Sequence, residues 1–235
     1  MKFSNFLDLI GFNRFAMHQR EIYISTIGGF LGIFFIFMTS YWLLAPEVAV
    51  LIVPSMGASA VLLFAAPHVP FSQPWNVMAG HALSAIVGVA CWHLIPDFTV
   101  AASASVGLSI GVMVLTRSIH PPGGATALAA VIGSEKLHAL GYTYEYQPIM
   151  LNALTILTVA IIFNGFFKWR QYPAHLYLRK QAVETKVSGY ASISHEDFVF
   201  ALSHIDTFVD IDESDLLKIY SLATKRHVEI NAPEK

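Results

Sequence analysis

Residues 121–128 read PPGGATAL and residues 54–61 read PSMGASAV, and this internal repeat decides how the chain folds. One proline, one glycine and two alanines are identical between the two octapeptides, and Ser59 corresponds to Thr126. Each copy interrupts an otherwise apolar segment, and a Gln-Pro pair follows each copy, at residues 73–74 and 147–148. The repeat therefore predicts two units of similar construction, about 21–96 and 97–170.

The composition around the repeat is typical of an integral membrane protein. The chain has 235 residues, of which 55% are hydrophobic and 13% are charged, whereas soluble domains carry about 25% charged residues. No Asp, Glu, Lys or Arg occurs from residue 48 to residue 96, and Arg117 is the one such residue from 98 to 134. Because so long a neutral stretch cannot form a water-exposed surface, we expect an all-α, polytopic membrane protein.

Apolar segments occur six times along the chain, three in each unit, at residues 22–44, 48–66, 75–95, 100–116, 119–133 and 149–167. Three crossings are an odd number, so the second unit should cross the membrane upside down relative to the first. The sequence thus predicts two inverted three-segment repeats, in which the octapeptides produce two broken or half helices. Small residues four apart predict close helix contacts at Gly28/Gly32, Gly80/Ser84/Gly88 and Gly107/Gly111.

Basic residues flank this membrane region of residues 21–170 at both ends: Lys2, Arg14 and Arg20 before it, and Lys168, Arg170, Arg179 and Lys180 at or after its end. Positive charge is retained on the cytoplasmic side of a membrane, so we expect both termini in the cytoplasm and the protein in a cell inner membrane. The first twenty residues also lack the pattern of a removable signal peptide.

Two flanking segments differ in composition from the membrane region. Residues 1–20 mix Phe, Leu and Ile with charged residues, which indicates an amphipathic segment at the membrane surface. Residues 171–235 form a predicted cytoplasmic tail with a helical hairpin at about 194–226, in which Ser194 and Asp212 are suitable N-caps. The hairpin would pack against the membrane region or against a second copy of the chain, which makes a homo-oligomer a candidate assembly.

Proline and glycine at matching positions of inverted repeats indicate a binding site near the middle of the membrane. A helix that restarts there has unpaired N–H groups and a partial positive charge, both of which suit an anion. The alternative is that these residues only allow tight helix packing. The candidate substrate-binding residues are Ser55, Gly57, Ala58, Ser59, Asn76, His81, Arg117, His120, Gly123, Gly124, Thr126 and Asn152.

The polar members of this set each have an alternative structural role. Arg117 has two interpretations. It is a ligand, because charged residues within a membrane usually belong to a functional site, or it lies at the cytoplasmic end of a helix, where positive charge is retained. His120 either serves the substrate or a proton, or it bonds to freed backbone groups. An asparagine in a span most often forms a hydrogen bond to a neighbouring helix.

Other kinds of site have no support in the sequence. The histidines lack the spacing of metal ligands, and no catalytic set, phosphate loop or cofactor motif is present. There is also no basic patch of the kind that binds nucleic acid. We therefore expect no enzyme, no cofactor and no metal site, with the lipid bilayer and a small anionic solute as partners.

The nine residues His120-Pro121-Pro122-Gly123-Gly124-Ala125-Thr126-Ala127-Leu128 resemble the HPP family of integral membrane proteins. The resemblance also includes residues 54–59 and 75–81, and it covers roughly residues 15 to 175. Family members are usually described with four membrane helices and a transport role, and cyanobacterial and chloroplast members are associated with nitrite transport. The resemblance therefore implies a transporter, although six segments depart from the usual helix count.

These observations predict membrane transport of a small solute, foremost a small inorganic anion such as nitrite. No ATP-binding motif is present, so we expect a secondary carrier or a channel. A membrane sensor or scaffold, with the cytoplasmic hairpin recruiting partners, is the alternative.

Overall fold

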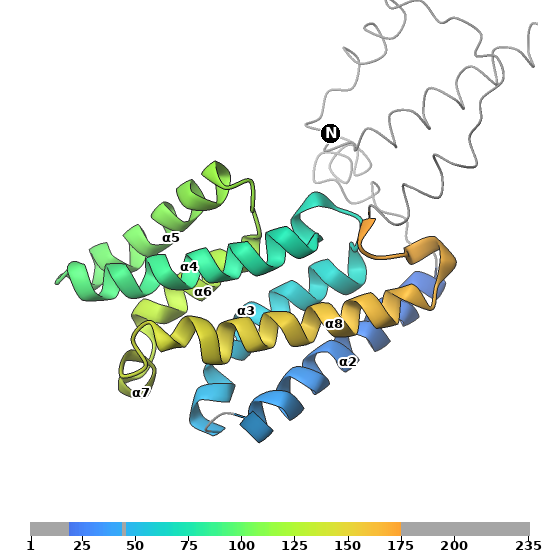
Figure 1. The fold of residues 1–235 in the computed structure, drawn as a ribbon, viewed down its shortest axis with the longest axis horizontal. Coiled ribbons are helices and arrows are strands. Elements are labelled where there is room, and N and C mark those ends of the chain that lie inside the picture. Colours follow the sequence, from blue (N-terminus) through green and yellow to red (C-terminus); the bar gives the residue numbers. More distant parts are fainter. Residues whose placement is uncertain (1–18, 44–45, 175–235) are drawn as a thin grey trace, which may run out of the picture. The chain divides into compact units, whose positions relative to one another are not determined.

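The computed structural model describes residues 19–43 and 46–174, which belong to one compact unit, Met1–Tyr177. The described residues form helices and connecting turns without a strand (Figure 1). The expected surface segment at 1–20 lies almost wholly outside the described residues, and so does the helical hairpin at 194–226. The elements are α2 (Gln19–Leu43), α3 (Pro46–Ala65), η1 (Pro70–Ser72), α4 (Pro74–Leu94), α5 (Phe98–Leu115), α6 (Pro121–Ile132), α7 (Glu135–His138), η2 (Glu145–Met150), α8 (Leu151–Gly165) and η3 (Lys168–Arg170).

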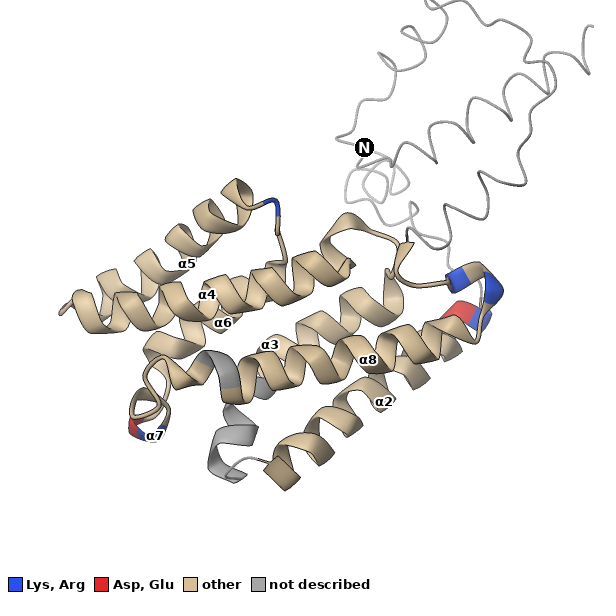
Figure 2. Ribbon diagram, viewed as in Figure 1, with Lys and Arg blue, Asp and Glu red and all other residues tan. Residues whose placement is uncertain are grey.

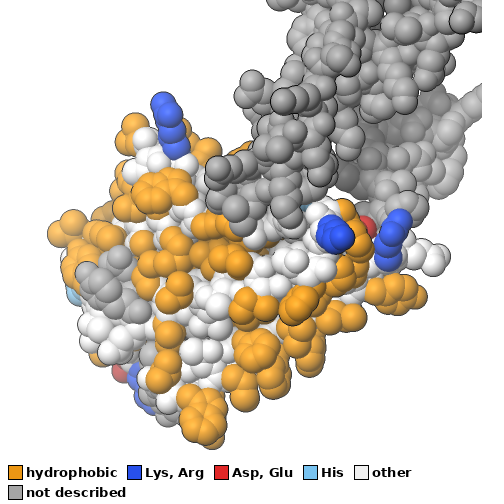
Figure 3. Space-filling view, turned by 45° about the vertical axis from the view of Figure 1, so that its right-hand side comes forward, with side chains coloured by type: hydrophobic (Ala, Val, Ile, Leu, Met, Phe, Trp, Pro, Cys, Tyr) orange, Lys and Arg blue, Asp and Glu red, His pale blue; other side chains and the backbone are white. Residues whose placement is uncertain are grey.

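Four of these helical stretches are long and apolar enough to cross a membrane: Gln19–Leu43, Pro74–Leu94, Phe98–Leu115 and Gln147–Gly165. Two shorter apolar helices, Pro54–Ala65 and Pro121–Ile132, contain the octapeptides. Hydrophobic side chains are spread over the face seen in Figure 3, and the charged residues lie at helix ends in Figure 2. A charge-free apolar exterior is what lipid requires. The all-helical architecture is thereby confirmed for the described residues, and four of the six expected segments are long and apolar enough to span a membrane.

Helices pack both within and between the two units of the sequence repeat, 21–96 and 97–170. Helix α2 packs against α3 and α8, while α5 packs against α6 and α4; α3 also contacts α6. Following the chain in Figure 1, α2 runs opposite to α5, α3 opposite to α6, and α4 opposite to α8.

The first octapeptide does not break its helix, contrary to expectation. Helix α3 continues from Pro46 to Ala65 with Pro54 inside it. The second octapeptide does begin a new helix: His120 is the extended N-cap, with φ −138° and ψ 101°, and α6 starts at Pro121. Pro54 costs the interior of α3 one backbone hydrogen bond, whereas Pro121 and Pro122 occupy the first turn of α6, where the missing N–H groups cost none.

Small residues let α4 and α6 approach closely, as expected for Gly80, Ser84 and Gly88. A Cβ atom on Gly88 would lie 2.5 Å from the Ala127 carbonyl oxygen, and one on Gly80 would lie 2.6 Å from the His120 Cβ. Gly28 and Gly32 approach the Phe64 ring in the same way. Gly107 and Gly111 do not fit this expectation, because no other described atom lies within 4 Å of a Cβ at either position.

Arg170 ties three helices together at one end of the bundle. Its side chain is 3% exposed, pairs with Glu21 of α2, and donates to the Phe64 carbonyl at the end of α3 and to Asn164 Oδ1 of α8. The Trp169 indole also donates to Glu21, over 2.6 Å. Free carbonyl groups at a helix C-terminus favour a cation. The sequence indicated only a topological role for Arg170.

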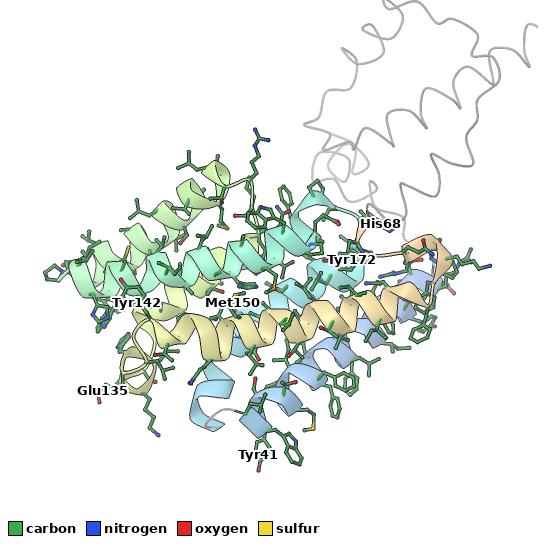
Figure 4. All side chains as sticks on the ribbon, viewed as in Figure 1. Tyr41, His68, Glu135, Tyr142, Met150 and Tyr172 are labelled. Carbon is green, nitrogen blue, oxygen red and sulfur yellow. The ribbon has the colours of Figure 1, made fainter. Side chains whose placement is uncertain are left out.

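The start of α4 and the end of α5 lie at this same end of the bundle. The Tyr172 hydroxyl donates to the Ser72 carbonyl, and His68 Nε2 donates to the Gln171 carbonyl, 3.2 Å away (Figure 4). Burial raises the pKa of Tyr172, so its hydroxyl stays protonated and able to donate. The Trp75 indole donates to the Thr116 carbonyl next to Arg117, over 3.3 Å. Arg117, Lys168 and Arg170 therefore lie at the same end of the bundle.

Candidate functional site

Four polar side chains meet in the interior of the helix bundle. Ser59 comes from α3, His81 from α4, His120 from the turn before α6, and Thr126 from α6; all are 0% exposed. Each is positioned by local structure: Ser59 and Thr126 occupy matching places in the octapeptides, and the tight α4–α6 contact brings His81 and His120 together. We call these four residues the polar cluster.

The polar cluster is joined by four short contacts in a row. His81 Nδ1 lies 2.8 Å from Thr126 Oγ1, and His81 Nε2 lies 2.9 Å from Ser59 Oγ. Ser59 Oγ lies 2.9 Å from His120 Nε2, and His120 Nδ1 lies 2.8 Å from the Phe71 carbonyl oxygen. His81 thus connects the two matched hydroxyl groups of the internal repeat.

Both hydroxyl groups have a second partner in their own helix. Ser59 Oγ is 3.3 Å from the Ser55 carbonyl oxygen, and Thr126 Oγ1 is 3.3 Å from the Pro122 carbonyl oxygen. The Tyr144 hydroxyl donates to the Thr126 carbonyl over 3.2 Å and so holds α6 from outside the polar cluster. The hydroxyl hydrogens can therefore turn between a ring nitrogen and a carbonyl.

Several predicted site residues surround the polar cluster or face away from it. Ser55 is buried one turn before Ser59, whereas Ala58 is exposed and Gly57 is half-buried. Gly57 has no other residue within 4 Å of a Cβ position. Two of the four predicted residues of α3 thus lie on its outer side.

Asn76, Arg117 and Asn152 do not reach the polar cluster. Asn76 Nδ2 donates to the Ile119 carbonyl, over 3.0 Å, and so fixes the turn before His120. Arg117 is exposed and has φ 55°. Asn152 on α8 accepts a hydrogen bond from Ser40 of α2, over 2.7 Å. Asn152 thus forms a hydrogen bond to a neighbouring helix, and Arg117 lies in the turn after α5.

The start of α6 differs from the predicted anion site. Pro121 and Pro122 have no N–H group, and the Gly123 N–H donates to the His120 carbonyl over 2.8 Å. The expected row of unpaired N–H groups is therefore absent from this turn. A Cβ on Gly123 would lie 2.8 Å from the Gly80 carbonyl and the Ser84 hydroxyl, so Gly123 serves the α4–α6 contact, and Gly124 faces Val106 of α5.

The charge around the polar cluster is small. Among the described residues the buried polar side chains are Ser, Thr, His and Asn together with Arg170, and none is a carboxylate. No group of three His, Cys, Asp or Glu that could hold a metal ion occurs among the described residues. The polar cluster therefore offers O–H and N–H donors and imidazole nitrogens, without a negative charge.

Comparison with known proteins gives a family match and two relatives. The family model described as "HPP, transmembrane region" matches residues 15–173. A transmembrane protein of Dictyostelium discoideum is 39% identical over 157 residues, which cover 65% of this chain and 50% of the relative. A second transmembrane protein of that organism is 38% identical over 159 residues, covering 66% of this chain and 55% of the relative. The chain thus spans about half the length of these relatives, and no solved structure matches it significantly.

Proposed function

Because this chain belongs to the HPP family of transmembrane proteins, we propose that it moves a small solute across the membrane at the polar cluster. The observation that carries the proposal is the complete burial of Ser59, His81, His120 and Thr126 between apolar helices. Burying polar groups in an apolar medium costs several kcal/mol unless they find partners. A bundle held together only for stability would have little use for two histidines at this place, whereas a solute pathway needs polar groups there.

An inverted repeat would allow the protein to alternate between two states, each open to a different side of the membrane. Supporting it, the first helix of each unit packs against the last helix of the other, α2 with α8 and α5 with α4. The opposed helix directions in Figure 1 agree with such a relationship. The closed polar cluster then corresponds to an occluded arrangement, and solute access requires α3 and α6 to move apart. Rocking of one unit against the other is a common way for transporters to expose a central site.

A small inorganic anion, with nitrite as the first candidate, suits this site better than a cation. Buried cation sites usually contain carboxylates, and none is buried among the described residues. When α3 and α6 move apart, hydroxyl and imidazole donors released from one another can instead bind an anion through charge-assisted hydrogen bonds. We propose direct side-chain donation in place of the helix N-terminus, since Pro121 and Pro122 have no N–H group to donate.

The proposed orientation places both termini in the cytoplasm of a cell with an inner membrane. Supporting it, Arg117, Lys168 and Arg170 all belong to the end of the bundle where α2 starts and α8 ends. Positive charge marks the cytoplasmic side. The alternative function, a sensor or scaffold acting through the hairpin at 194–226, depends on residues outside the described part of the chain.

Uptake of labelled nitrite into liposomes that contain only the full-length protein tests the proposal. We expect Thr126→Val to weaken binding by about 1–3 kcal/mol, because a buried donor is lost. Thr126→Ser retains the hydroxyl and is the matched control. Uptake equal to that of protein-free vesicles, for nitrite and for other small anions and neutral solutes, would contradict a transport function and favour the scaffold alternative.

A further inference from the structure

We propose that the polar cluster takes up a proton, and that the protein carries its anion together with that proton. This inference rests on the transport function proposed above and assigns the second transported species. Its basis is the order of the four contacts: with both histidines neutral, only one distribution of hydrogens gives every contact a hydrogen.

The Phe71 carbonyl sets that distribution. A carbonyl oxygen only accepts hydrogen bonds, so the contact of 2.8 Å requires the hydrogen to be on His120 Nδ1. A neutral imidazole has one N–H, so His120 Nε2 is then an acceptor and the hydrogen of its 2.9 Å contact must come from Ser59.

The same reasoning continues to the other end of the row. Since the Ser59 hydrogen points to His120, Ser59 Oγ must accept from His81 Nε2 across their 2.9 Å contact. His81 Nδ1 is then an acceptor, and Thr126 donates to it over 2.8 Å. All four hydrogens therefore point from Thr126 toward Phe71, so a proton accepted at His81 can move as far as His120.

An additional proton moves through this row without leaving a charge on an oxygen. When a proton binds His81 Nδ1, the Thr126 hydroxyl turns to the Pro122 carbonyl, 3.3 Å away. The His81 Nε2–H bond then breaks as an O–H bond forms on Ser59, and the former Ser59 hydrogen forms a new N–H bond on His120 Nε2. One proton has entered at His81 and one positive charge now resides on His120, with no oxidation or reduction.

The proton is released by the same steps in reverse: it returns from His120 Nε2 to Ser59, the Ser59 hydrogen returns to His81 Nε2, and His81 Nδ1 gives up its hydrogen. While His120 is charged, both of its nitrogens donate, and Ser59 can turn its hydrogen to the Ser55 carbonyl, 3.3 Å away. The titratable side chain that contacts the polar cluster from a neighbouring element is Tyr144, which bonds to the Thr126 carbonyl. Arg170, the one buried charge among the described residues, has Glu21, Asn164 and the Phe64 carbonyl as its partners.

An anion and a proton are complementary in this environment. An anion alone beside a neutral polar cluster would be an uncompensated buried charge, which is costly in a low-dielectric interior. A histidine that takes up a proton as the anion arrives supplies the opposite charge. The pair crosses with no net charge, so transport should respond to a pH gradient and not to the membrane potential.

The test uses the full-length protein in liposomes that contain a trapped pH-sensitive dye, with sodium nitrite as the probe. Acidification of the outside should accelerate nitrite uptake, and the dye should report a proton entering with each nitrite. A potassium diffusion potential should have no effect on the rate. Protein-free vesicles measured in parallel give the background from nitrous acid that crosses the lipid by itself.

Ser59→Ala interrupts the row between the two rings, and we expect the proton-coupled component of nitrite uptake to fall by about tenfold or more, the loss of one charge-assisted bond. Ser109→Ala is the matched control, because it removes a buried hydroxyl of α5 that has no hydrogen-bond partner among the described residues. If Ser59→Ala does not insert, the wild-type measurement still decides, because the dye reports the proton directly.

The outcomes separate this inference from the proposed function. Nitrite uptake without proton movement, or uptake driven by the membrane potential, would overturn proton coupling and leave the transport function intact. Absence of uptake by the wild-type protein would overturn both. Equal proton coupling in Ser59→Ala and Ser109→Ala would remove the polar cluster from the proton pathway.

Discussion

The imidazole rings of His81 and His120 meet edge to face, with their centroids 4.8 Å apart, and both rings contact the hydroxyl group of Ser59. Two histidines that share one hydroxyl cannot change their hydrogens independently. A change in the protonation of either ring therefore alters the hydrogen-bond direction at the other.

The first prediction concerns the tautomers of these two rings. We expect neutral His120 to carry its hydrogen on Nδ1 and neutral His81 to carry it on Nε2, because the Phe71 carbonyl must accept. Nitrogen NMR of the histidine-labelled protein in lipid distinguishes the two forms. Assignment comes from the loss of one signal in each single His→Gln variant. A hydrogen on Nε2 of neutral His120 would contradict the proposed direction of the row.

The second prediction concerns the α4–α6 contact. Gly88→Ala should destabilise the protein by roughly 1–3 kcal/mol, because backbone atoms must move to admit a methyl group. Gly107→Ala, at a position with free space, should be neutral or stabilise its helix by up to about 1 kcal/mol. Thermal unfolding in detergent compares the two variants. Equal behaviour would show that the close approach at Gly88 does not determine stability.

The third prediction concerns Arg170. Arg170→Gln should lower the free energy of unfolding by about 3–5 kcal/mol, because Glu21 and the end of α3 lose a buried partner. Lys168→Gln, at an exposed position in the same turn, is the control. The measurement is again thermal unfolding in detergent, and a similar midpoint for the two variants would argue against the tie between α2, α3 and α8.

The fourth prediction concerns membrane sidedness. In a Cys91→Ala background, Arg117→Cys and Lys168→Cys should react with a membrane-impermeant thiol reagent from one side, and Glu135→Cys from the other. The hydrogen bonds of Trp75 and Trp169 put the first two positions at one end of the bundle. Labelling of intact cells against inverted vesicles measures the side, and reaction of Arg117→Cys and Lys168→Cys from different sides would exclude this arrangement.

The two octapeptides predicted one feature of the polar cluster. Matching positions in a repeat predicted that Ser59 and Thr126 are equivalent, and both belong to the polar cluster. Sequence spacing could not show that His81 lies between them, because that depends on how closely α4 and α6 pack. The acceptor at Phe71 is a main-chain group, and no side-chain pattern reveals it.

The differences between the two copies also have a physical origin. The sequence pattern treated Pro54 and Pro121 as equivalent breaks, but Pro54 lies inside α3, whereas Pro121 and Pro122 form the first turn of α6. Arg117 could not be assigned from hydropathy, since a cation at a helix end and a cation at a binding site look alike in sequence. The hydrogen bond from the Trp75 indole to the Thr116 carbonyl places Arg117 at the end of the bundle where α4 starts.

The acceptor at the end of the row has one more consequence. Because the Phe71 oxygen belongs to the peptide backbone, every amino acid at position 71 presents the same acceptor, and no point substitution there can delete it. Side-chain substitutions in the polar cluster can weaken or interrupt the row of hydrogen bonds. Reversing the direction of donation at His120 Nδ1 would require a different main-chain conformation of η1. The direction of the hydrogens is thus inherited with the fold itself.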